Sequence, residues 1–566
     1  MKIKKYLSLF LILTLILTGL VGCGGDSQET GQAAQEGEQV ENSETGIDSE
    51  QYLNGYLVAE PSTLDPSKGS DSYSNTVLNN VLEPLTRLEE DENLNNILAP
   101  AGAERWDVNE DGTVWTFYLR DNKWSDGEPV TAHDYEYGIK RSLDPNTGSP
   151  YAYLLTPIKN AAAVNSGELP VDELGVKALD DKTLEITLEY STPYFVQLTY
   201  QRVMLPQRKD IVEKYGDTYG TEPDTIVYNG PFILTEWIHN SELKFTKNSN
   251  YWDAENVKFE NVSMKIISDE NAIYNSLSNK SIDTASVGSP EWIEKFSSED
   301  SLRHIEIINP STFYLFFNTK DDVFENANIR KAFSLAIDRQ ELSNVIFHGI
   351  HEPAYGWVPP SISLGDQEYR SVVEGPLKKL AEENPDPKAL LIKGLEELGM
   401  DTNPENLTVK ISLGGTDQWF RTYGEYLQQM YNRNLGVNIE IEQLEWPIFN
   451  SNIMKGEFQI GYMGWGAEYN DPASMLSLLK SDSTAIATGW TNERYDELID
   501  LAAAEMDDQK RLEYYREAEN ILLYEESVVA PSVYPKSNIF RYKYVHGLSA
   551  TPFGTAGWKY GYTQGR

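Results

Sequence analysis

The single cysteine of this chain, Cys23 among 566 residues, restricts its fold more than any other feature of the sequence. Without a second cysteine, no intrachain disulfide can constrain the body of the protein. The chain from about residue 51 onward is too long for a single hydrophobic core, because single cores stop growing at roughly 250–300 residues. The sequence therefore predicts two or three lobes without covalent cross-links.

The first 22 residues have the pattern of a signal peptide. Three lysines among the first five residues precede an apolar segment at 6–20, which is shorter than the roughly 20 residues that a membrane-spanning helix needs. It ends in Leu-Val-Gly before Cys23, which resembles the bacterial lipobox. We expect lipidation of Cys23 and an anchor on the extracytoplasmic face of the cell membrane. An uncleaved signal anchor with an incidental cysteine is the alternative.

Residues 23–50 have the composition of a linker. They are rich in Gly, Ser, Gln, Glu and Asp, and a segment of this kind cannot bury enough apolar surface to fold. Behind a lipidated cysteine it predicts a flexible acidic tether that holds the body just outside the membrane.

The formal net charge of −41 limits the possible partners. It argues against nucleic acid, whose phosphates require a basic surface, and it disfavours direct contact with anionic lipid. The charge is explained by a well-solvated surface, with attraction of cationic ligands as the alternative. We expect a soluble, monomeric body.

Two segments have the pattern of β-strands. Residues 115–119 and 183–188 are rich in β-branched and aromatic side chains, and Asp-Gly and Asp-Asp turn signals precede them.

Three segments have apolar residues at helical spacing, at 328–340, 418–434 and 492–523. The second lies between strand-like residues 409–413 and 437–441, a β-α-β pattern that predicts a parallel pair of strands. The body is therefore expected to belong to the α/β class.

Twelve segments, in order along the body, resemble the family 5 extracellular solute-binding proteins, and most closely their oligopeptide-binding members. They are EPSTLDP (60–66), LAP (98–100), ERW (104–106), WTFYLR (115–120), WSDGEPVTAHD (124–134), DPNTGSPYA (144–152), NGPF (229–232), EW (236–237), KNSNYWD (247–253), FNT (317–319), IRKAFSLAIDR (329–339) and GWGAEYNDP (464–472).

This resemblance implies a periplasmic-binding-protein-like clamshell of type II, in which two lobes are joined by two crossing strands and carry a third, smaller domain. By position, the first lobe comprises 51–73, 205–305 and 533–566, the smaller domain 74–204, and the second lobe 306–532. The crossing strands are expected near 306–314 and 528–534. Two hinges are sufficient for closure around a ligand.

The same resemblance implies a lipoprotein that captures oligopeptides and delivers them to the permease subunits of an ABC-type importer. Dipeptides, nickel chelates or oligosaccharides are alternative cargoes, because one fold serves several ligands. A peptide-pheromone receptor is a further alternative.

A peptide binder without sequence preference has to recognise the backbone and the charged ends of its ligand. The free α-amino group needs a carboxylate in a closed cleft. In oligopeptide-binding relatives an acidic residue of the Gly-Trp-x-Ala-Asp-Tyr motif has this role, and the matching residue here is Glu468, one methylene longer. We favour Glu468, with Asp471 as the alternative.

The resemblance also implies the walls of the cleft. Backbone on one side of the ligand is expected from Glu60, Ser62 and Thr63. The other side is assigned to the residues from Tyr462 to Gly466, which include Gly464 and Trp465. Tyr137 is a candidate wall from the smaller domain. For Trp465 and Tyr137, core packing is the alternative, as is usual for aromatic residues.

Relatives that hold the peptide carboxylate directly use basic or imidazole side chains, at positions that match Tyr462 and Trp419 here. Neither can carry a positive charge. Arg421 could substitute, although nothing in the spacing requires it. The preferred peptide length therefore stays open.

No motif indicates an enzyme or a cofactor. Gly-x-Ser-x-Gly, P-loop and His-Glu-x-x-His patterns are absent. His348 and His351 are the only closely spaced histidines, and Gly349 and Pro353 place them in a loop, so no metal site is expected.

Overall fold

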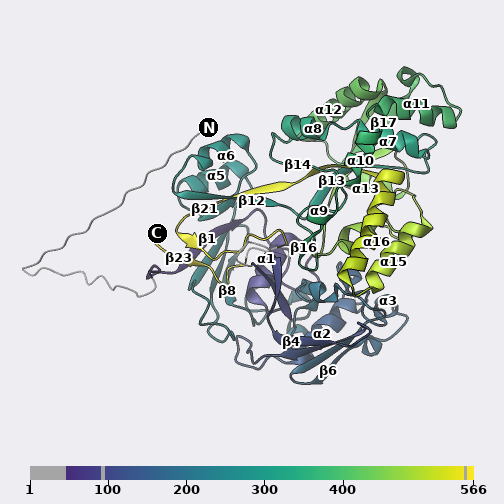
Figure 1. The fold of residues 1–566 in the computed structure, drawn as a ribbon. Coiled ribbons are helices and arrows are strands. Elements are labelled where there is room, and N and C mark those ends of the chain that lie inside the picture. The colour runs from purple at the N-terminus through teal and green to yellow at the C-terminus, as the bar shows by residue number, and fades with distance from the viewer. Residues whose placement is uncertain (1–45, 91–95, 554–556) are drawn as a thin grey trace, which may run out of the picture. The chain divides into compact units, whose positions relative to one another are not determined.

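The computed structural model describes residues 46–90, 96–553 and 557–566, whose sheets and helices are drawn in Figure 1. The predicted signal peptide and Cys23 lie outside the described residues. Ile47–Arg566 forms one compact unit, so the body begins before residue 51. The reason is Asp48, whose carboxylate accepts hydrogen bonds from the N–H groups of Gly565 and Arg566. No helix in the described part combines the length and apolar character needed to cross a membrane.

The first strand belongs to a four-stranded sheet of order β1-β10-β9-β8. β1 and β10 are parallel, and the other neighbours are antiparallel. Every second residue of β1 is buried, so one face of the sheet packs on the core. Helix α1 follows β1 in the chain and is capped by Asp71, which accepts a hydrogen bond from the N–H of Ser74. The bounds are β1 Tyr52–Leu57, α1 Ser72–Val81, β8 Phe232–Ile238, β9 Glu242–Lys247 and β10 Asn261–Ile266.

A second four-stranded sheet, of order β4-β5-β7-β6, is antiparallel throughout and carries α2. It confirms both strands expected from the sequence, and the turn before β5 contains Gly112 at φ +71°. Trp115, Phe117 and Leu119 alternate inward from β5. The sheet lies in the lower part of Figure 1, in blue. The bounds are β4 Ala103–Val108, β5 Val114–Leu119, α2 Ala132–Leu143, β6 Val176–Asp180 and β7 Thr183–Thr187.

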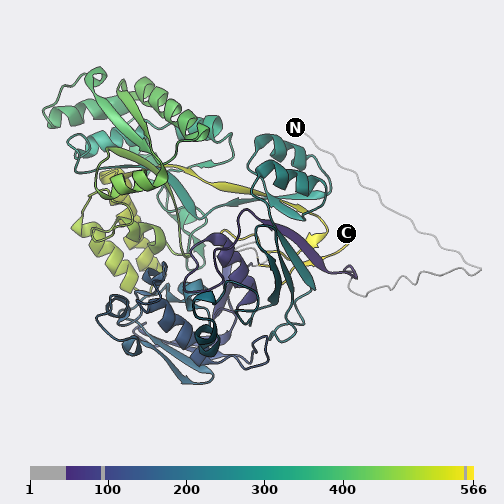
Figure 2. The same ribbon diagram turned by 180° about the vertical axis from the view of Figure 1, so that it is seen from behind.

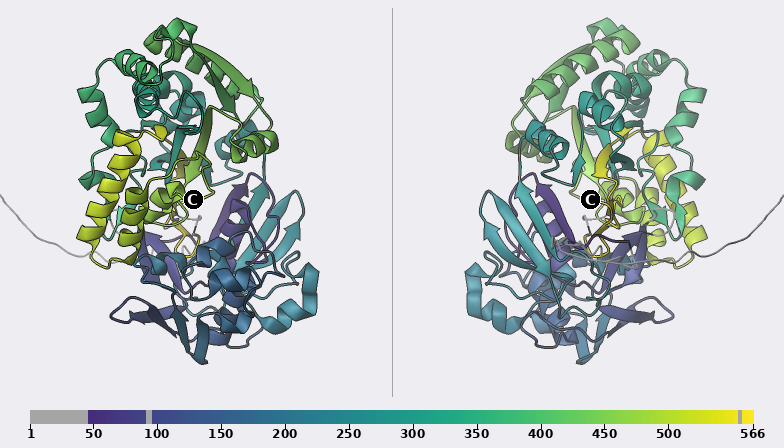
Figure 3. Two further views of the ribbon diagram at one scale, coloured as in Figure 1. Left: turned by 90° about the vertical axis from the view of Figure 1, so that its right-hand side faces the viewer. Right: turned by 90° about the vertical axis from the view of Figure 1, so that its left-hand side faces the viewer.

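The largest sheet has six strands in the order β14-β20-β13-β19-β17-β18. β17, α12 and β18 form the expected β-α-β unit with parallel strands. β13 sends Leu315 and Phe317 into one hydrophobic cluster and Tyr314 and Phe316 into the other, so the sheet is covered on both faces. Figure 3 shows helices around it. The bounds are β13 Ser311–Phe317, β14 Glu352–Pro353, β17 Thr408–Leu413, α12 Gln418–Leu435, β18 Asn438–Gln443, β19 Ile460–Gly466 and β20 Val529–Tyr534.

Two of the expected helices are each interrupted, which corrects the sequence prediction. Residues 328–340 are divided between α7 (Ala327–Leu335) and α8 (Arg339–Ile346), and residues 492–523 between α15 (Glu493–Ala504) and α16 (Asp508–Asn520). In each case an aspartate begins the new helix: Asp338 accepts from the N–H of Glu341, and Asp507 from the N–H groups of Gln509 and Lys510.

Two chain segments connect the six-stranded sheet to a three-stranded sheet of order β11-β21-β12. β12 (Leu302–Ile308) continues into β13 through two residues, and β20 continues into β21 (Lys536–Tyr542) through Pro535. β12 pairs with β21 and β13 pairs with β20, both antiparallel. Figures 1 and 2 show this ribbon crossing the molecule, with the later segment in yellow.

The remaining elements connect or cover these sheets. The strands are β2 Thr86–Glu90, β3 Asn96–Pro100, β11 Thr284–Ser286, β15 Ser363–Leu364, β16 Gln367–Glu368, β22 Val545–His546 and β23 Tyr562–Thr563. The helices are α3 Ala161–Asn165, α4 Lys209–Tyr215, α5 Glu270–Ser278, α6 Pro290–Ser297, α9 Tyr369–Val372, α10 Pro376–Glu383, α11 Pro387–Glu397, α13 Trp446–Met454 and α14 Ala473–Leu476.

Candidate functional site

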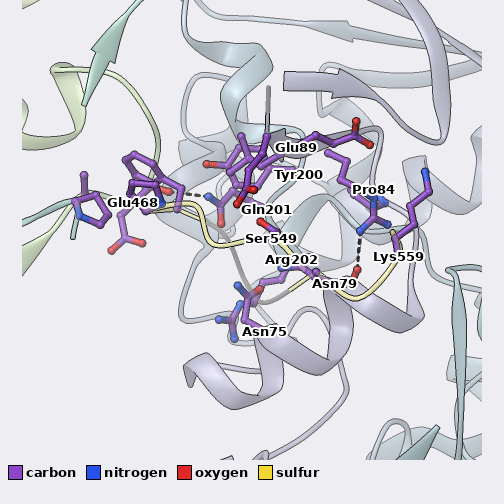
Figure 4. A pocket seen from close by; sticks show the side chains of 18 of the residues that line it. Asn75, Asn79, Pro84, Glu89, Tyr200, Gln201, Arg202, Glu468, Ser549 and Lys559 are labelled. Carbon is purple, nitrogen blue, oxygen red and sulfur yellow. Dashed lines mark hydrogen bonds between the residues drawn. The ribbon is translucent and has the colours of Figure 1, made fainter. Parts of the chain in front are cut away.

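A cavity of about 480 Å³ lies where α1, β2 and the segment after β19 approach one another; we call it the Glu468 cavity. It is large enough for a small-molecule or short-peptide ligand. Its lining includes residues 200–202 and parts of the C-terminal segment, and Figure 4 shows these side chains around it. Charged and aromatic side chains alternate on its walls: Arg87, Glu89, Glu90, Tyr151, Tyr200, Arg202, Glu468, Phe553, Lys559 and Tyr560.

Glu468 lies two residues after the end of β19, and its backbone is fixed on both sides. Its N–H donates to the hydroxyl of Ser474 at 2.8 Å, and its carbonyl accepts from Nε2 of Gln201 at 2.7 Å. Burial raises the pKa of the Glu468 carboxyl, and a hydrogen bond from Tyr153 and the charge of Arg202 partly offset this effect. Within the described chain Glu468 forms no ion pair at 4 Å or less. A desolvated carboxylate without a counter-ion suits a cationic ligand group.

Aromatic rings from the segment before α3 face Glu468. The rings of Tyr151 and Tyr153 stack at 5.9 Å, and the guanidinium carbon of Arg202 lies 5.0 Å from the centre of the Tyr151 ring. The Tyr200 hydroxyl is buried and has no hydrogen-bond partner among the residues of the described ranges. The Tyr200 hydroxyl can therefore bond to a ligand without breaking such a bond of the protein.

The strand β19 leaves part of its backbone free for pairing. β13 pairs with β19 over its whole length, from Ile460 to Gly466. On the other side β17 pairs only with the residues from Ile460 to Tyr462. In the part of the chain that the structure describes, no strand pairs with the rest of that edge, which contains the exposed Gly464 and Gly466. An edge of this kind can bind an extended chain.

Trp465 and Tyr462 on β19 lie in different surroundings. Trp465 is half-buried and packs against the core. Tyr462 is buried, and its ring lies 4.5 Å from Tyr423 and 6.2 Å from Trp419. Trp419 is 38 % exposed at the start of α12, where its ring stacks on Tyr423 at 5.2 Å. Trp419, Tyr423 and Tyr462 therefore form an aromatic cluster, and none of the three lines the Glu468 cavity.

The three residues assigned to the opposite wall do not line the Glu468 cavity. Glu60 accepts hydrogen bonds at Oε1 from the indole of Trp237 and contacts His239. Ser62 donates from its hydroxyl to Oδ2 of Asp71 at 2.5 Å. Thr63 donates from its N–H to the hydroxyl of Ser74 at 3.4 Å. Ser62 and Thr63 support the start of α1, which does form a wall of the cavity.

Two further candidates from the sequence, Asp471 and Tyr137, do not line the Glu468 cavity. Asp471 is 4 % exposed and forms an ion pair with Arg511 at 2.7 Å, so its carboxylate is already satisfied. Tyr137 lies on α2, packed against the core, and does not line the cavity. Tyr151 lies there instead, in the DPNTGSPYA segment that carried part of the resemblance.

Arg202 and Tyr153 are the site residues that sequence reasoning missed. No motif includes Arg202, and its burial depends on contacts between distant segments. Tyr153 directly follows the DPNTGSPYA segment, so that segment was the available signal.

Of the two closely spaced histidines, His348 and His351, the second is held by aromatic and backbone neighbours. His351 packs between Phe313 and Phe347, and its Nδ1 accepts a hydrogen bond from the N–H of Lys536. Burial and the charge of Lys536 lower the pKa of His351 to about 4. Among the described residues no three His, Cys, Asp or Glu side chains are grouped so as to hold a metal ion.

Comparison with known proteins places this geometry in a family. Residues 98–486 match the model of the bacterial extracellular solute-binding proteins, family 5. The chain is 33 % identical over 555 residues to the dipeptide-binding protein DppE of Bacillus subtilis, covering 98 % of each chain. It is 33 % identical to the oligopeptide-binding protein OppA of the same organism, covering 93 % of this chain and 92 % of that one.

Solved structures agree with these matches. The substrate-binding domain of an oligopeptide ABC transporter from Bacillus anthracis has a TM-score of 0.72 at 31 % identity, covering 92 % of this chain and all of that one. The murein tripeptide binding protein MppA of Escherichia coli has a TM-score of 0.75 at 27 % identity, with coverage of 92 % and 99 %. The predicted α/β clamshell of type II is confirmed, and the chain belongs to the family 5 bacterial extracellular solute-binding proteins.

Proposed function

We propose that this protein captures oligopeptides outside the cytoplasmic membrane and delivers them to the permease subunits of an ABC-type importer. The observation that carries the proposal is Glu468, a buried carboxylate without an ion-pair partner in the described chain, placed two residues after the free edge of β19. Relatives named as dipeptide- and oligopeptide-binding proteins support a peptide as the ligand.

The proposed binding mode uses the backbone for affinity and the charge for orientation. The peptide pairs with β19 beyond Tyr462, and its α-ammonium group lies against Glu468. Main-chain pairing does not discriminate between sequences, and water in the side-chain pockets tolerates different side chains. The segments that cross between the sheets, near 308–311 and 534–536, provide the two hinges for closure.

The domain boundaries belong to the same proposal. We assign 205–305 with the N- and C-terminal segments of the body to one lobe, 306–532 to the other, and 74–204 to the smaller domain. The Glu468 cavity is then shared by all three, because α1, Arg202, Glu468 and Ser549 line it together.

We also propose the lipid anchor at Cys23 and an extracytoplasmic location, on the basis of the signal-peptide pattern. The protein acts by binding and release as a monomer, without a catalytic step and without nucleic acid. In place of a basic clamp for the ligand carboxylate, the aromatic cluster of Trp419, Tyr423 and Tyr462 lines that end.

A thermal-shift screen tests the proposal. The body from Ile47 is mixed with peptide pools of graded length, with nickel chelates and with oligosaccharides. A ligand of the native state raises the melting temperature by mass action. Stabilisation by peptides supports the proposal and defines the length range. Stabilisation by a sugar or a chelate alone would overturn the cargo assignment.

A further inference from the structure

Arg202 is a buried cation without a carboxylate partner. The residue is 7 % exposed, and in the described ranges no Asp or Glu oxygen lies within 4 Å of its guanidinium. Its Nη2 donates to the backbone carbonyl of Asp71 at 3.1 Å, and its Nη1 has no hydrogen-bond partner among the described residues. Burying an arginine in this way is costly, so the side chain needs another explanation than packing.

Three other buried arginines of this protein have carboxylate or several carbonyl partners. Arg511 pairs with Asp471 at 2.7 Å, and Arg330 pairs with Glu526 at 2.8 Å. Arg339 has no carboxylate, but it donates to several backbone carbonyls, including that of Ala354. Arg541 resembles Arg202 in having a single carbonyl acceptor, but it does not line the Glu468 cavity.

Asp71 does not neutralise Arg202 by an ion pair. Its carboxylate caps α1 and is occupied by Ser62 and Ser74, which donate from their N–H and hydroxyl groups. Only its backbone carbonyl is bonded to Arg202. The guanidinium fits there because position 69 is glycine: a Cβ on Gly69 would lie 3.2 Å from Nη1.

Arg202 and Glu468 line the same cavity, as Figure 4 shows, without forming an ion pair with each other. Both side chains are desolvated, and they remain apart. Glu468 can therefore pair with a cationic group of a ligand, and Arg202 with an anionic group. The ring of Tyr151 covers the guanidinium from one side, at 5.0 Å, and restricts its orientation.

We propose that the Glu468 cavity recognises a ligand with an ammonium group and a nearby carboxylate, Glu468 binding the first and Arg202 the second. In a peptide, this chemistry is provided by an acidic side chain at the first or second residue, or by the terminal carboxylate of a dipeptide. The inference rests on the proposed peptide-binding function and adds a sequence preference to it. Uncharged side chains at these positions leave Arg202 without a partner.

The experiment is isothermal titration of the body from Ile47 with tetra-alanine variants that carry Glu or Gln at each position in turn. We expect Glu at position one or two to bind about tenfold more tightly than Gln, equivalent to about 1.4 kcal/mol. Arg202→Gln should reduce this ratio to within about twofold, whether or not the affinity for the Gln peptides also changes. A matched control is Arg105→Gln, which removes an exposed guanidinium of the same charge. A comparison of the affinities of dipeptides and of their C-terminal amides tests whether Arg202 binds the terminal carboxylate of a dipeptide.

The outcomes separate the two proposals. If no peptide binds at all, the proposed function fails and the inference fails with it. If Glu and Gln peptides bind the unmodified protein equally, the inference alone is wrong. If Arg202→Gln weakens all peptides equally and lowers the melting temperature, Arg202 is structural. The Glu-to-Gln ratio of the unmodified protein decides the question even if the variant does not fold.

Discussion

Glu468 and Asp471 are three residues apart, yet their surroundings give them different chemistry. Asp471 is bonded to Arg511, to the hydroxyl of Tyr515 and to the N–H of Ala473, so it is satisfied by the protein itself. Glu468 is buried with its pKa raised, and it has no ion-pair partner within 4 Å among the described residues. A ligand ammonium group can therefore gain from Glu468 but not from Asp471.

Glu468→Gln should weaken the binding of peptides with a free amino terminus by about tenfold or more and leave N-terminally acetylated peptides nearly unaffected. The substitution removes a charge that pairs only with a free ammonium group, and charge-assisted hydrogen bonds contribute roughly 1.5–3 kcal/mol. Isothermal titration with paired free and acetylated peptides measures the difference.

The exposed Glu110 provides the matched control, since Glu110→Gln makes the same chemical change far from any charged partner. It should leave both affinities unchanged. An equal loss for free and acetylated peptides in Glu468→Gln would show that Glu468 acts by shaping the cleft, not by pairing with the amino terminus.

At the scale of residues, sequence reasoning proposed Glu468 as a candidate but could not describe its surroundings. The Gly-Trp-x-Ala motif fixes the position of Glu468 in the sequence relative to the strand before it, and such a short spacing can be read from the sequence. Tyr137 packs against the core, the alternative given for it, and the faces of α2 cannot be distinguished from sequence without its packing partners. Arg202 is distinguished by the absence of a carboxylate partner among the described residues, and such an absence is not visible in a sequence.

At the scale of elements, β19 is paired on one side by β13 along its whole length and on the other by β17 only as far as Tyr462. The two glycines of the unpaired part leave little side chain there. The Cβ of a residue replacing Gly464 would lie 2.5 Å from the ring of Phe313, so this position requires glycine. The backbone of β19 is therefore both accessible and rigid where it is unpaired.

Backbone N-methylation of a bound peptide should reduce affinity at alternate residues. In strand pairing, successive N–H groups of the ligand point to opposite sides, so every second one bonds to β19. We expect about a tenfold loss at bonded positions, since a backbone hydrogen bond contributes roughly 0.5–1.5 kcal/mol and the methyl group adds a clash. The remaining positions should tolerate the methyl group within about threefold.

Titration of a set of tetra- or pentapeptides, each methylated at one nitrogen, gives this profile directly. The unmethylated peptide with the same sequence is the control. A flat profile, with equal losses or none at all positions, would contradict strand pairing with β19 and indicate recognition by side chains.

The helices show which elements the sequence could predict. The residues 418–434 were predicted as one helix and are found in α12, whose ends are marked by Asp417 and by Gly436 at φ 81°. The residues 328–340 were predicted as one helix but form two, because Asp338 caps a new helix inside an apolar repeat that continues across the break. The apolar repeat indicates which face of a helix is buried. An aspartate that caps a new helix within this repeat looks like an ordinary polar position.

At the scale of the whole molecule, the class of fold was predictable and the beginning of the body was not. The order of the family motifs implied lobes joined by two crossing strands. Composition alone placed residues 47–50 in the tether, but Asp48 bonds to residues more than 500 positions away in the chain. Contacts between the two ends of a chain leave no local signal.

Cys23→Ser should release the protein from membranes while leaving its body intact. No helix of the described residues can span a membrane, and a net charge of −41 disfavours attraction to anionic lipid. Acyl chains on Cys23 therefore supply all of the proposed membrane affinity, about 0.8 kcal/mol for each buried methylene.

After ultracentrifugation the unmodified protein should sediment with membranes, and the Cys23→Ser protein should appear in the soluble extracytoplasmic fraction with the same melting temperature and peptide affinity. Ser27→Ala, a substitution in the same tether that leaves the cysteine in place, should stay with the membranes. If the Cys23→Ser protein sediments with the membranes as well, the uncleaved apolar segment at 6–20 is the anchor and the lipobox interpretation is wrong.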